Sequence, residues 1–263
     1  MIERVADLDV SAASGLLRVG DELWIAADDE HELLVCDRHG CRLREVALAR
    51  GTLPAEEAAR KALKLDFEAM ALLPDGSVLV LGSGSRPTRR RGARLAGGVV
   101  TELDLGPLYR RLDEELPELN IEGAAMGGEV LRLLSRGNGP AGRNAVIDVD
   151  AVALLAGGDG LRRVTPVELG ELEGVRLGFT DATPAGDALL FSAAAEASPD
   201  TYQDGPFAGS AIGLLDGATV RWLRPVGPEK IEGLTRWDDE LLLVSDADDR
   251  SRRAGLYRTP WPL

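Results

Sequence analysis

One pattern returns five times along the chain and constrains its fold more than any other feature. Each copy has a short apolar run, a tight turn such as PDG, GGE or AGD, and a second apolar run that breaks into Gly, Ser, Asp or Arg. The copies lie at residues 13–31, 66–86, 120–139, 179–198 and 230–250. Paired apolar runs at a period of about 50 residues are typical of four-stranded propeller blades. The sequence therefore predicts an all-β, five-bladed β-propeller.

The last copy predicts how the ring closes. It supplies two strands and the segment GLYRTPW at 255–261, but no outermost strand. Residues 3–10, ERVADLDV, resemble the outermost strands of the other blades. We expect this N-terminal strand to complete the last blade, because closure removes open strand edges from the ring. In the second blade the pattern predicts strands at 67–73, 77–82, 93–96 and 98–104.

Two segments outside the repeat have helical spacing. LPAEEAARKALKL at 53–65 and LGPLYRRLDEELPEL at 105–119 carry charged residues on one side and Leu, Ala and Tyr on the other. Both connect an outermost strand to the next inner strand. In a meandering blade these connections emerge on the same face as the loops between the second and third strands. The sequence thus predicts one domain spanning residues 1–263, with a loop-rich face that carries two short helical insertions.

Charge and composition exclude several classes of function. The formal net charge of -14 and a pI near 4.7 disfavour partners such as nucleic acid or an anionic membrane, which require a basic face. The start, MIERVADLDV, lacks the apolar core of a signal peptide, and no segment reaches the 18 apolar residues of a membrane span. We therefore expect a cytoplasmic protein that binds neither nucleic acid nor membrane.

Four potential zinc ligands lie in or beside one predicted hairpin of the first blade: His31, Cys36, His39 and Cys41. Structural zinc sites usually take two ligand pairs from separate elements, so an ordinary outer hairpin is the favoured interpretation. The two cysteines flank the turn DRHG and could face each other across it. Without an export signal, free thiols are favoured over a disulfide.

Acidic residues stand at the start of four predicted inner strands: Glu68, Glu122, Asp181 and Glu232, with Ser14 in the first copy. Because inner strands surround the axis, we expect these carboxylates to ring the channel mouth on the loop-rich face. Carboxylates this close repel one another unless something compensates their charge. A hard cation such as Ca²⁺ would do so, and so would Arg136 reaching in from a loop. A third possibility is that each acid caps backbone N–H groups and has no chemical role.

The stretches DFEAMALLPDGSVLVLGSGSRPTRRRG and LNIEGAAMGGEVLRLLSRGNG closely resemble an uncharacterised bacterial family of predicted β-propellers, over most of the chain. More distantly, the repeated IEG or FEA before a buried strand is similar to the phytase-like propeller domain described as esterase-like. It is also similar to metal-dependent lactonase propellers, which hold a divalent cation on the axis. The lactonase pattern of one Glu with Asn and Asp ligands is matched only at its Glu positions. The distant resemblance implies a metal-assisted hydrolase.

Both His residues belong to the first blade's hairpin, so a Ser-His-Asp or Cys-His centre on the axis would lack its base.

Two functions remain open. In the first hypothesis, Ca²⁺ or another divalent cation on the acid ring activates an ester, lactone or phosphoester, with Glu122 and Arg136 as catalytic residues. In the second, the propeller is a non-enzymatic module that binds a small anion or peptide on its loop-rich face. The candidate substrate-binding residues are Arg86, Arg136, Asn138 and Asp246.

A basic run, Arg89 to Arg91, follows the second copy. Such a run is usually the solvated face of a loop. In a protein this acidic it could instead attract an anionic ligand, because it is the chain's only basic patch. The sequence alone leaves both interpretations open.

Overall fold

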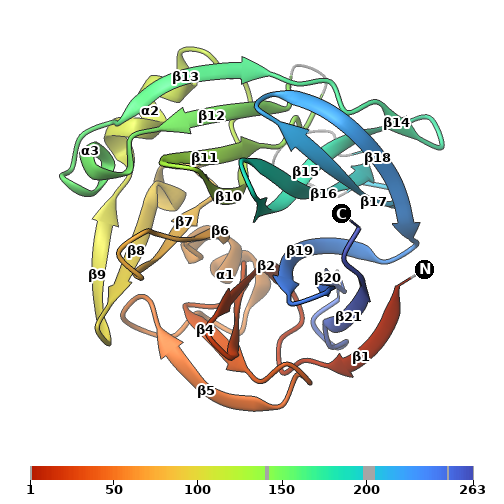
Figure 1. The fold of residues 1–263 in the computed structure, drawn as a ribbon. Helices are drawn as coiled ribbons and strands as arrows, with labels where there is room; N and C mark the ends of the chain where they lie inside the picture. Colours follow the sequence, from red (N-terminus) through yellow and green to blue (C-terminus); the bar gives the residue numbers. More distant parts are fainter. Residues whose placement is uncertain (1, 140–141, 198–204, 248, 263) are drawn as a thin grey trace.

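A computed structural model describes residues 2–139, 142–197, 205–247 and 249–262. Within these residues, antiparallel sheets follow one another around a central axis, as the ribbon in Figure 1 shows. Each sheet holds four strands of a meander, which are consecutive in the chain except in the last blade, and blade four carries one short extra strand. The prediction of an all-β, five-bladed propeller is confirmed.

The blades are numbered along the chain, with strands given from the axis outward. Blade one is β2 (Ala13–Val19), β3 (Glu22–Ala27), β4 (Glu32–Cys36) and β5 (Arg42–Ala47). Blade two is β6 (Phe67–Leu72), β7 (Val78–Gly82), β8 (Arg91–Ala96) and β9 (Val99–Asp104). Blade three is β10 (Ile121–Gly127), β11 (Val130–Ser135), β12 (Ala145–Val149) and β13 (Leu161–Pro166). Blade four is β15 (Val175–Ala185), β16 (Ala188–Glu196), β17 (Phe207–Asp216) and β18 (Thr219–Gly227), with β14 (Glu171–Leu172) beside β15.

Blade five joins the two ends of the chain. It consists of β19 (Lys230–Trp237), β20 (Glu240–Asp246), β21 (Gly255–Pro260) and β1 (Glu3–Asp7). β1 pairs antiparallel with β21, so that Glu3 lies opposite Arg258. The expected closure by the N-terminal strand is confirmed. It gives β21 a partner on its outer side and leaves no gap in the ring.

Hydrophobic clusters fill the spaces between neighbouring blades. The described residues form five such clusters, one at each blade-to-blade junction. The junction of blades two and three is the one reinforced by a helix, α2 (Gly106–Asp113), whose Leu108, Tyr109 and Leu112 are buried. Burial of apolar side chains at every junction holds the inner strands at fixed positions around the axis.

Both expected helices form, but each is shorter than the sequence suggested. α1 (Glu57–Leu63) starts after Glu56, whose carboxylate accepts hydrogen bonds from the N–H groups of Ala58 and Ala59. α2 ends early because Pro117 disfavours helical geometry at the residue before it. A 3₁₀ turn, η1 (Pro87–Arg89), and a third helix, α3 (Ala151–Leu155), were not anticipated. None of the described helices is long and apolar enough to cross a membrane.

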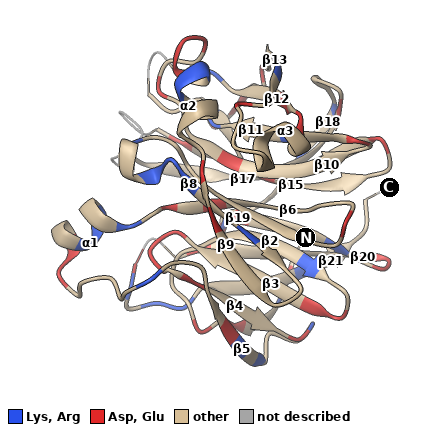
Figure 2. Ribbon diagram, turned by 90° about the vertical axis from the view of Figure 1, so that its left-hand side faces the viewer, with Lys and Arg blue, Asp and Glu red and all other residues tan. Residues whose placement is uncertain are grey.

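The cysteines of the β4–β5 hairpin are free, as expected, with Cys36 buried and Cys41 exposed. The helix α1 stands out from one face of the disc and buries none of its residues (Figure 2). The connections before the inner strands and those between second and third strands open on this same face, where they surround a cavity. The expected loop-rich face is therefore present.

Candidate functional site

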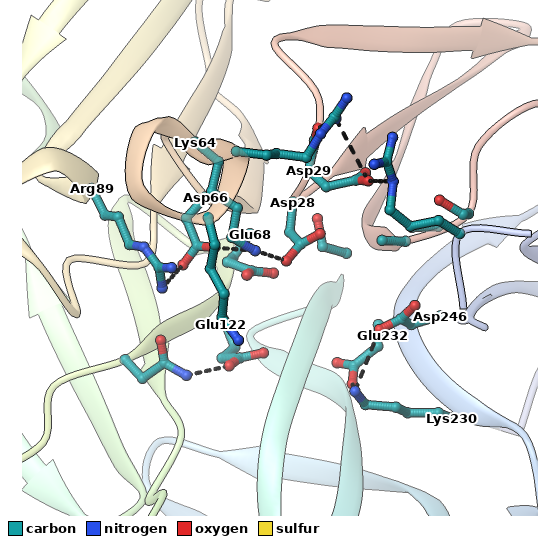
Figure 3. Close-up of a pocket in the computed structure, with 18 of the residues that line it drawn as sticks. Asp28, Asp29, Lys64, Asp66, Glu68, Arg89, Glu122, Lys230, Glu232 and Asp246 are labelled. Carbon is teal, nitrogen blue, oxygen red and sulfur yellow. Dashed lines mark hydrogen bonds and ion pairs between the residues drawn. The ribbon is translucent and has the colours of Figure 1, made fainter. Parts of the chain in front are cut away.

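A polar cavity of about 250 Å³ opens at the axis on the face that carries α1. All five blades contribute residues to it, and Figure 3 shows the labelled side chains converging on one open space. Among the described lining residues, ten are acidic and seven are basic. The acids are Asp28, Asp29, Glu57, Asp66, Glu68, Glu122, Glu196, Glu232, Asp246 and Asp249; the bases are Arg60, Lys61, Lys64, Arg89, Arg136, Lys230 and Arg250.

The register of the inner strands defines which residues are equivalent around the axis. Each inner strand has a β-bulge near its start, where one residue is skipped in the pairing with the second strand. The skipped residues are Ser14, Glu68, Glu122, Thr180 and Glu232. The equivalent position in blade four is thus Thr180, not Asp181. The ring of bulge residues contains three acids and two hydroxyl groups.

The two hydroxyl members of the ring tie neighbouring blades together. Ser14 Oγ donates to the carbonyl oxygen of Phe67 at 2.7 Å, and Thr180 Oγ1 donates to that of Ile231 at 2.8 Å. Both acceptors are the residue just before the next blade's bulge. Glu68, Glu122 and Glu232 line the cavity, as Ser14 also does, whereas Thr180 lies outside the lining.

Asp181 lies one residue further along β15 and outside the cavity lining. Its carboxylate accepts hydrogen bonds from the backbone N–H groups of Leu234 at 2.9 Å, Ala182 at 2.8 Å and Leu16 at 3.4 Å. Burial raises the pKa of Asp181 well above its ordinary value, against the opposing effect of these three donors. Asp181 thus links blade four to blades one and five.

Arg136, the predicted cationic partner of the ring, is buried among three carboxylates. It lies 2.7 Å from an oxygen of Glu196, 3.6 Å from Glu122 and 3.7 Å from Glu232. Lys230 sits in the same part of the cavity, 3.4 Å from Asp246 and 3.6 Å from both Glu196 and Glu232. Two basic side chains therefore compensate four acids on this side of the cavity.

Glu122 combines burial with a neutral hydrogen-bond partner. The side-chain amide of Asn120 donates to Glu122 Oε1 and also to Asn138 Oδ1, the latter at 3.0 Å. Burial raises the pKa of Glu122 to about 8; the nearby Arg136 lowers it and Glu232 raises it further. Glu122 is thus protonated in a large fraction of molecules near neutral pH, and it can give that proton to a ligand in the cavity.

The opposite side of the cavity holds a tight cluster of acids. Oxygens of Asp28, Asp66 and Glu68 all lie within 4.8 Å of one another, the one group of possible metal ligands within the described ranges. Lys64 Nζ contacts the Asp28 carboxylate and lies 2.7 Å from Asp66 Oδ1. On its other oxygen, Asp66 accepts a hydrogen bond from Arg89 at 2.7 Å. We find no hydrogen bond or ion pair of Glu68 within the described part of the chain.

Two acids of this cluster, Glu68 and Asp66, differ in proton affinity. Burial, together with the charges of Asp66 and Glu122, raises the pKa of Glu68 well above its ordinary value. Burial would also raise the pKa of Asp66, but Lys64 and Arg89 outweigh it and lower the pKa. The cluster therefore pairs a stable carboxylate anion with a carboxyl group that holds its proton unless a further positive charge arrives.

The structure brings most of the predicted site residues together. Glu68, Glu122, Glu232, Arg136, Asn138 and Asp246 all line the cavity. Arg86 is exposed and lies outside the lining. Asp181 is buried and also lies outside the lining. Of the predicted metal ligands, Glu68 belongs to the acid cluster, whereas Glu122 and Glu232 face Arg136.

Sequence reasoning missed several lining residues that flank the repeated slot. Asp66 and Asn120 immediately precede their inner strands, and Lys230 is the first residue of its inner strand. Asp28 follows the second strand of blade one, and Glu196 ends that of blade four. These positions vary from blade to blade, so they do not appear as a repeat. A comparison of the residue two places before each bulge would have found Asp66, Asn120 and Lys230.

Solved structures of other proteins resemble this chain. A protein provisionally described as a glycosidase, from Bacteroides thetaiotaomicron, is similar in structure, with a TM-score of 0.55 and 13% sequence identity over 98% of this chain and 89% of that one. A protein provisionally described as a glycoside hydrolase, from Parabacteroides distasonis, gives a TM-score of 0.55 and 11% identity over 97% and 88%. The β-propeller domain of Cps50 (Swd1) from Myceliophteria thermophila gives 0.44 and 10% over 91% of this chain, which spans 64% of that domain's length.

At such low identity, the two structures with a TM-score of 0.55 support the propeller fold alone. The search of curated proteins returned no match. The sequence itself matches a protein family over residues 9–260, nearly the whole propeller described above. The chain is a member of the family of unknown function DUF6929.

Proposed function

We propose that this protein is a metal-assisted hydrolase that acts on a small ester or lactone in the axial cavity. The observation that carries the proposal is the division of the cavity into two parts. One part holds the carboxylate cluster of Asp28, Asp66 and Glu68, and the other holds Glu122, a carboxyl group with a pKa of about 8. A candidate cation site and a proton donor thus face one space, the combination that metal-assisted hydrolysis of a carboxylic ester uses.

The acid cluster suits a hard divalent cation such as Ca²⁺, Mg²⁺ or Mn²⁺, because its donors are carboxylate oxygens. Lys64 Nζ contacts two of the three acids, so the ion would compete with a single ammonium group for the same oxygens. The bound cation would supply positive charge that polarises the carbonyl oxygen of the substrate. The raised pKa of Glu68 fits this role, since a neighbouring cation would drive that proton off.

The residues around Glu122 supply the proton transfers. The oxygen of water forms its bond to the carbonyl carbon as the π electrons of the C=O bond move to its oxygen; when the C=O bond forms again, the bond from that carbon to the leaving oxygen breaks. Glu122 gives its proton to the leaving oxygen, and Glu232 takes the proton that water releases. One nitrogen of Arg136 lies 3.6 Å from Glu122 and 3.7 Å from Glu232, so it holds both carboxyl groups on the same side of the cavity.

The charge of the lining favours an ester or lactone over a phosphoester. Acids outnumber bases among the described lining residues, and the two bases nearest Glu122 are already held by carboxylates. A phosphoester would bring further negative charge into this space. In this proposal Arg136 offsets the negative charge of the carboxylates around it.

The test compares the parent with two isosteric variants, each with divalent cations and with a chelator. Glu68→Gln removes a proposed ligand without breaking a described ion pair, and Glu129→Gln alters an exposed turn as a control. A cation at 100 times its Kd for the parent should raise the free energy of unfolding of the parent and of Glu129→Gln by about 2.7 kcal/mol. It should raise that of Glu68→Gln far less. Hydrolysis of p-nitrophenyl acetate and of a lactone should need the same cation and fall in Glu122→Gln. A parent that is unaffected by every cation, and inactive, refutes the proposal.

One observation favours the alternative of a non-enzymatic binding module. Arg136 and Lys230 already compensate Glu122, Glu196, Glu232 and Asp246, so that half of the cavity needs no metal. In that case the loop-rich face would bind a small anion or a peptide without turnover. The same experiment separates the two functions, because the module predicts no stabilisation by cations and no hydrolysis.

A further inference from the structure

A second cavity of about 220 Å³ lies at the junction of blades one and two, away from the axial site. Leu48, Leu65 and Phe67 give it an apolar wall, and Phe67 and Leu48 are themselves buried. Its polar residues are His31, Arg50, Arg91 and Glu102. None of the residues assigned to the axial site lines this cavity, so it is independent of the function proposed above.

His31 contributes an unused hydrogen-bonding group to this junction. Its side chain is 8% exposed, and its Nδ1 lies 3.4 Å from the carbonyl oxygen of Gly51. Its buried Nε2 has no hydrogen-bond partner among the described residues. Buried polar groups normally find partners, so this unpaired ring nitrogen leaves the polar groups of the junction incompletely satisfied.

The basic run of the sequence divides among three places in the structure. Arg89 pairs with Asp66 in the axial cavity, and Arg90 pairs with Asp113 at the end of α2. Arg91 alone lines the second cavity, where its guanidinium lies 3.6 Å from Glu102. Arg50 lies on the same rim, and no hydrogen bond or ion pair of Arg50 is found in the described part of the chain.

We propose that this second cavity binds a small organic carboxylate that carries an apolar group. Arg50 and Arg91 offer planar guanidinium groups that match the two oxygens of a carboxylate. The negative charge of Glu102 offsets one of the two positive charges of Arg50 and Arg91. The net charge of +1 suits a monoanion better than a phosphate dianion. The wall of Leu48, Leu65 and Phe67 would cover the apolar group, and the His31 ring would lie beside the ligand.

Histidine NMR signals provide a direct test, because the chain has only two histidines. His39 is exposed on the β4–β5 turn and serves as an internal control. Sodium benzoate, titrated at constant ionic strength, should shift the His31 ring signals in a saturable way and leave His39 in place. Benzamide, which has the same shape without the charge, should give no saturable shift. Arg91→Gln and Arg50→Gln should each weaken benzoate binding about tenfold, the loss expected for one charge-assisted pair.

Arg94→Gln is the matched control, since Arg94 lies on the same strand as Arg91 but outside the second cavity. It should bind benzoate like the parent. Three results would each overturn the proposal: no saturable shift of His31, an equal response to benzamide, or unchanged affinity in both Arg50→Gln and Arg91→Gln. All of these substitutions alter exposed or partly exposed side chains, so the variants should fold.

Discussion

Gly178 leaves the space that the Arg136 side chain occupies: a Cβ atom at position 178 would lie 2.6 Å from Arg136 Cγ. Arg136 can therefore cross from blade three over the inner strand of blade four and reach Glu196. The absence of one side chain in blade four thus sets the position of the buried cation that holds Glu122 and Glu232.

Replacing Gly178 by Ala should destabilise the protein, because the added methyl group displaces Arg136 from its carboxylates. We expect a loss of about 1–3 kcal/mol in the free energy of unfolding, as for other overpacked positions. Urea denaturation measures it. In an Arg136→Ala background the same substitution should cost little, since the clash is gone. Equal costs in both backgrounds would contradict the assigned contact.

Glu122 should make stability depend on pH. Its pKa in the folded protein, about 8, lies above the ordinary 4.5, so the folded state holds the proton more tightly than the unfolded chain. This stabilisation is complete below pH 4.5 and is lost as the pH rises toward 8. Glu122→Gln should flatten the fall in the free energy of unfolding between pH 5 and 8. Glu129→Gln should retain the slope of the parent, and a parent without any fall in this range would rule out the raised pKa.

Asp181→Asn should destabilise the propeller, although the substitution preserves the shape of the side chain. An amide has only one acceptor oxygen, so its NH₂ group must face at least one of the N–H groups of Leu16, Ala182 and Leu234. The expected cost is about 1–3 kcal/mol, the penalty for a buried donor without an acceptor. Asp239→Asn, on the exposed β19–β20 turn, is the control. If Asp181 instead belonged to the cation site, the response to cations would disappear as well.

The two cysteines should react at very different rates. Cys41 is exposed, whereas burial raises the pKa of the Cys36 thiol to about 12. Because the thiolate is the nucleophile, iodoacetamide should modify one thiol in the native protein and the second only after unfolding. Mass spectrometry counts the adducts and locates them. Rapid labelling of Cys36 under native conditions would mean that the hairpin opens.

Deleting residues 1–10 should remove the outermost strand of blade five. β21 would then present an unpaired edge, and Leu8 would be lost from the cluster between blades five and one. We expect aggregation or a broad, non-cooperative unfolding transition. A truncated protein that melts like the parent would show that the closing strand contributes little.

Strand order could be predicted from the sequence because turns and apolar runs repeat in every blade. The strands predicted for blade two at 67–73 and 77–82 correspond to β6 and β7 within one residue. Helix lengths could not be predicted as well, since Glu56 and Pro117 act locally within otherwise helical patterns. α3 has only five residues, too few for a clear helical period.

The residues of the acid ring were predicted less well. The bulge residue of each inner strand and the residue after it have different roles, although they are neighbours in the sequence. In the segment FTD (179–181), Asp181 resembles the acidic residue of the FEA and IEG segments in the other blades. The strand pairing nevertheless makes Thr180 the bulge residue. Asp181 corresponds to Gly15, Ala69, Gly123 and Gly233, where small residues leave room for backbone at the axis. Only the pairing of the strands, which the sequence does not state, distinguishes the two positions.

The pairing of β1 with β21 also determines when the axial cavity can form. Arg4 and Tyr257, which contact each other across this pair, are 253 residues apart, so the last blade cannot assemble until both have left the ribosome. Individual meanders depend on local hairpins and can form earlier during synthesis. The cavity, which needs all five blades, is then a late product of folding. A nascent chain arrested before β21 would expose a charged, unfinished axis to chaperones rather than to ligands.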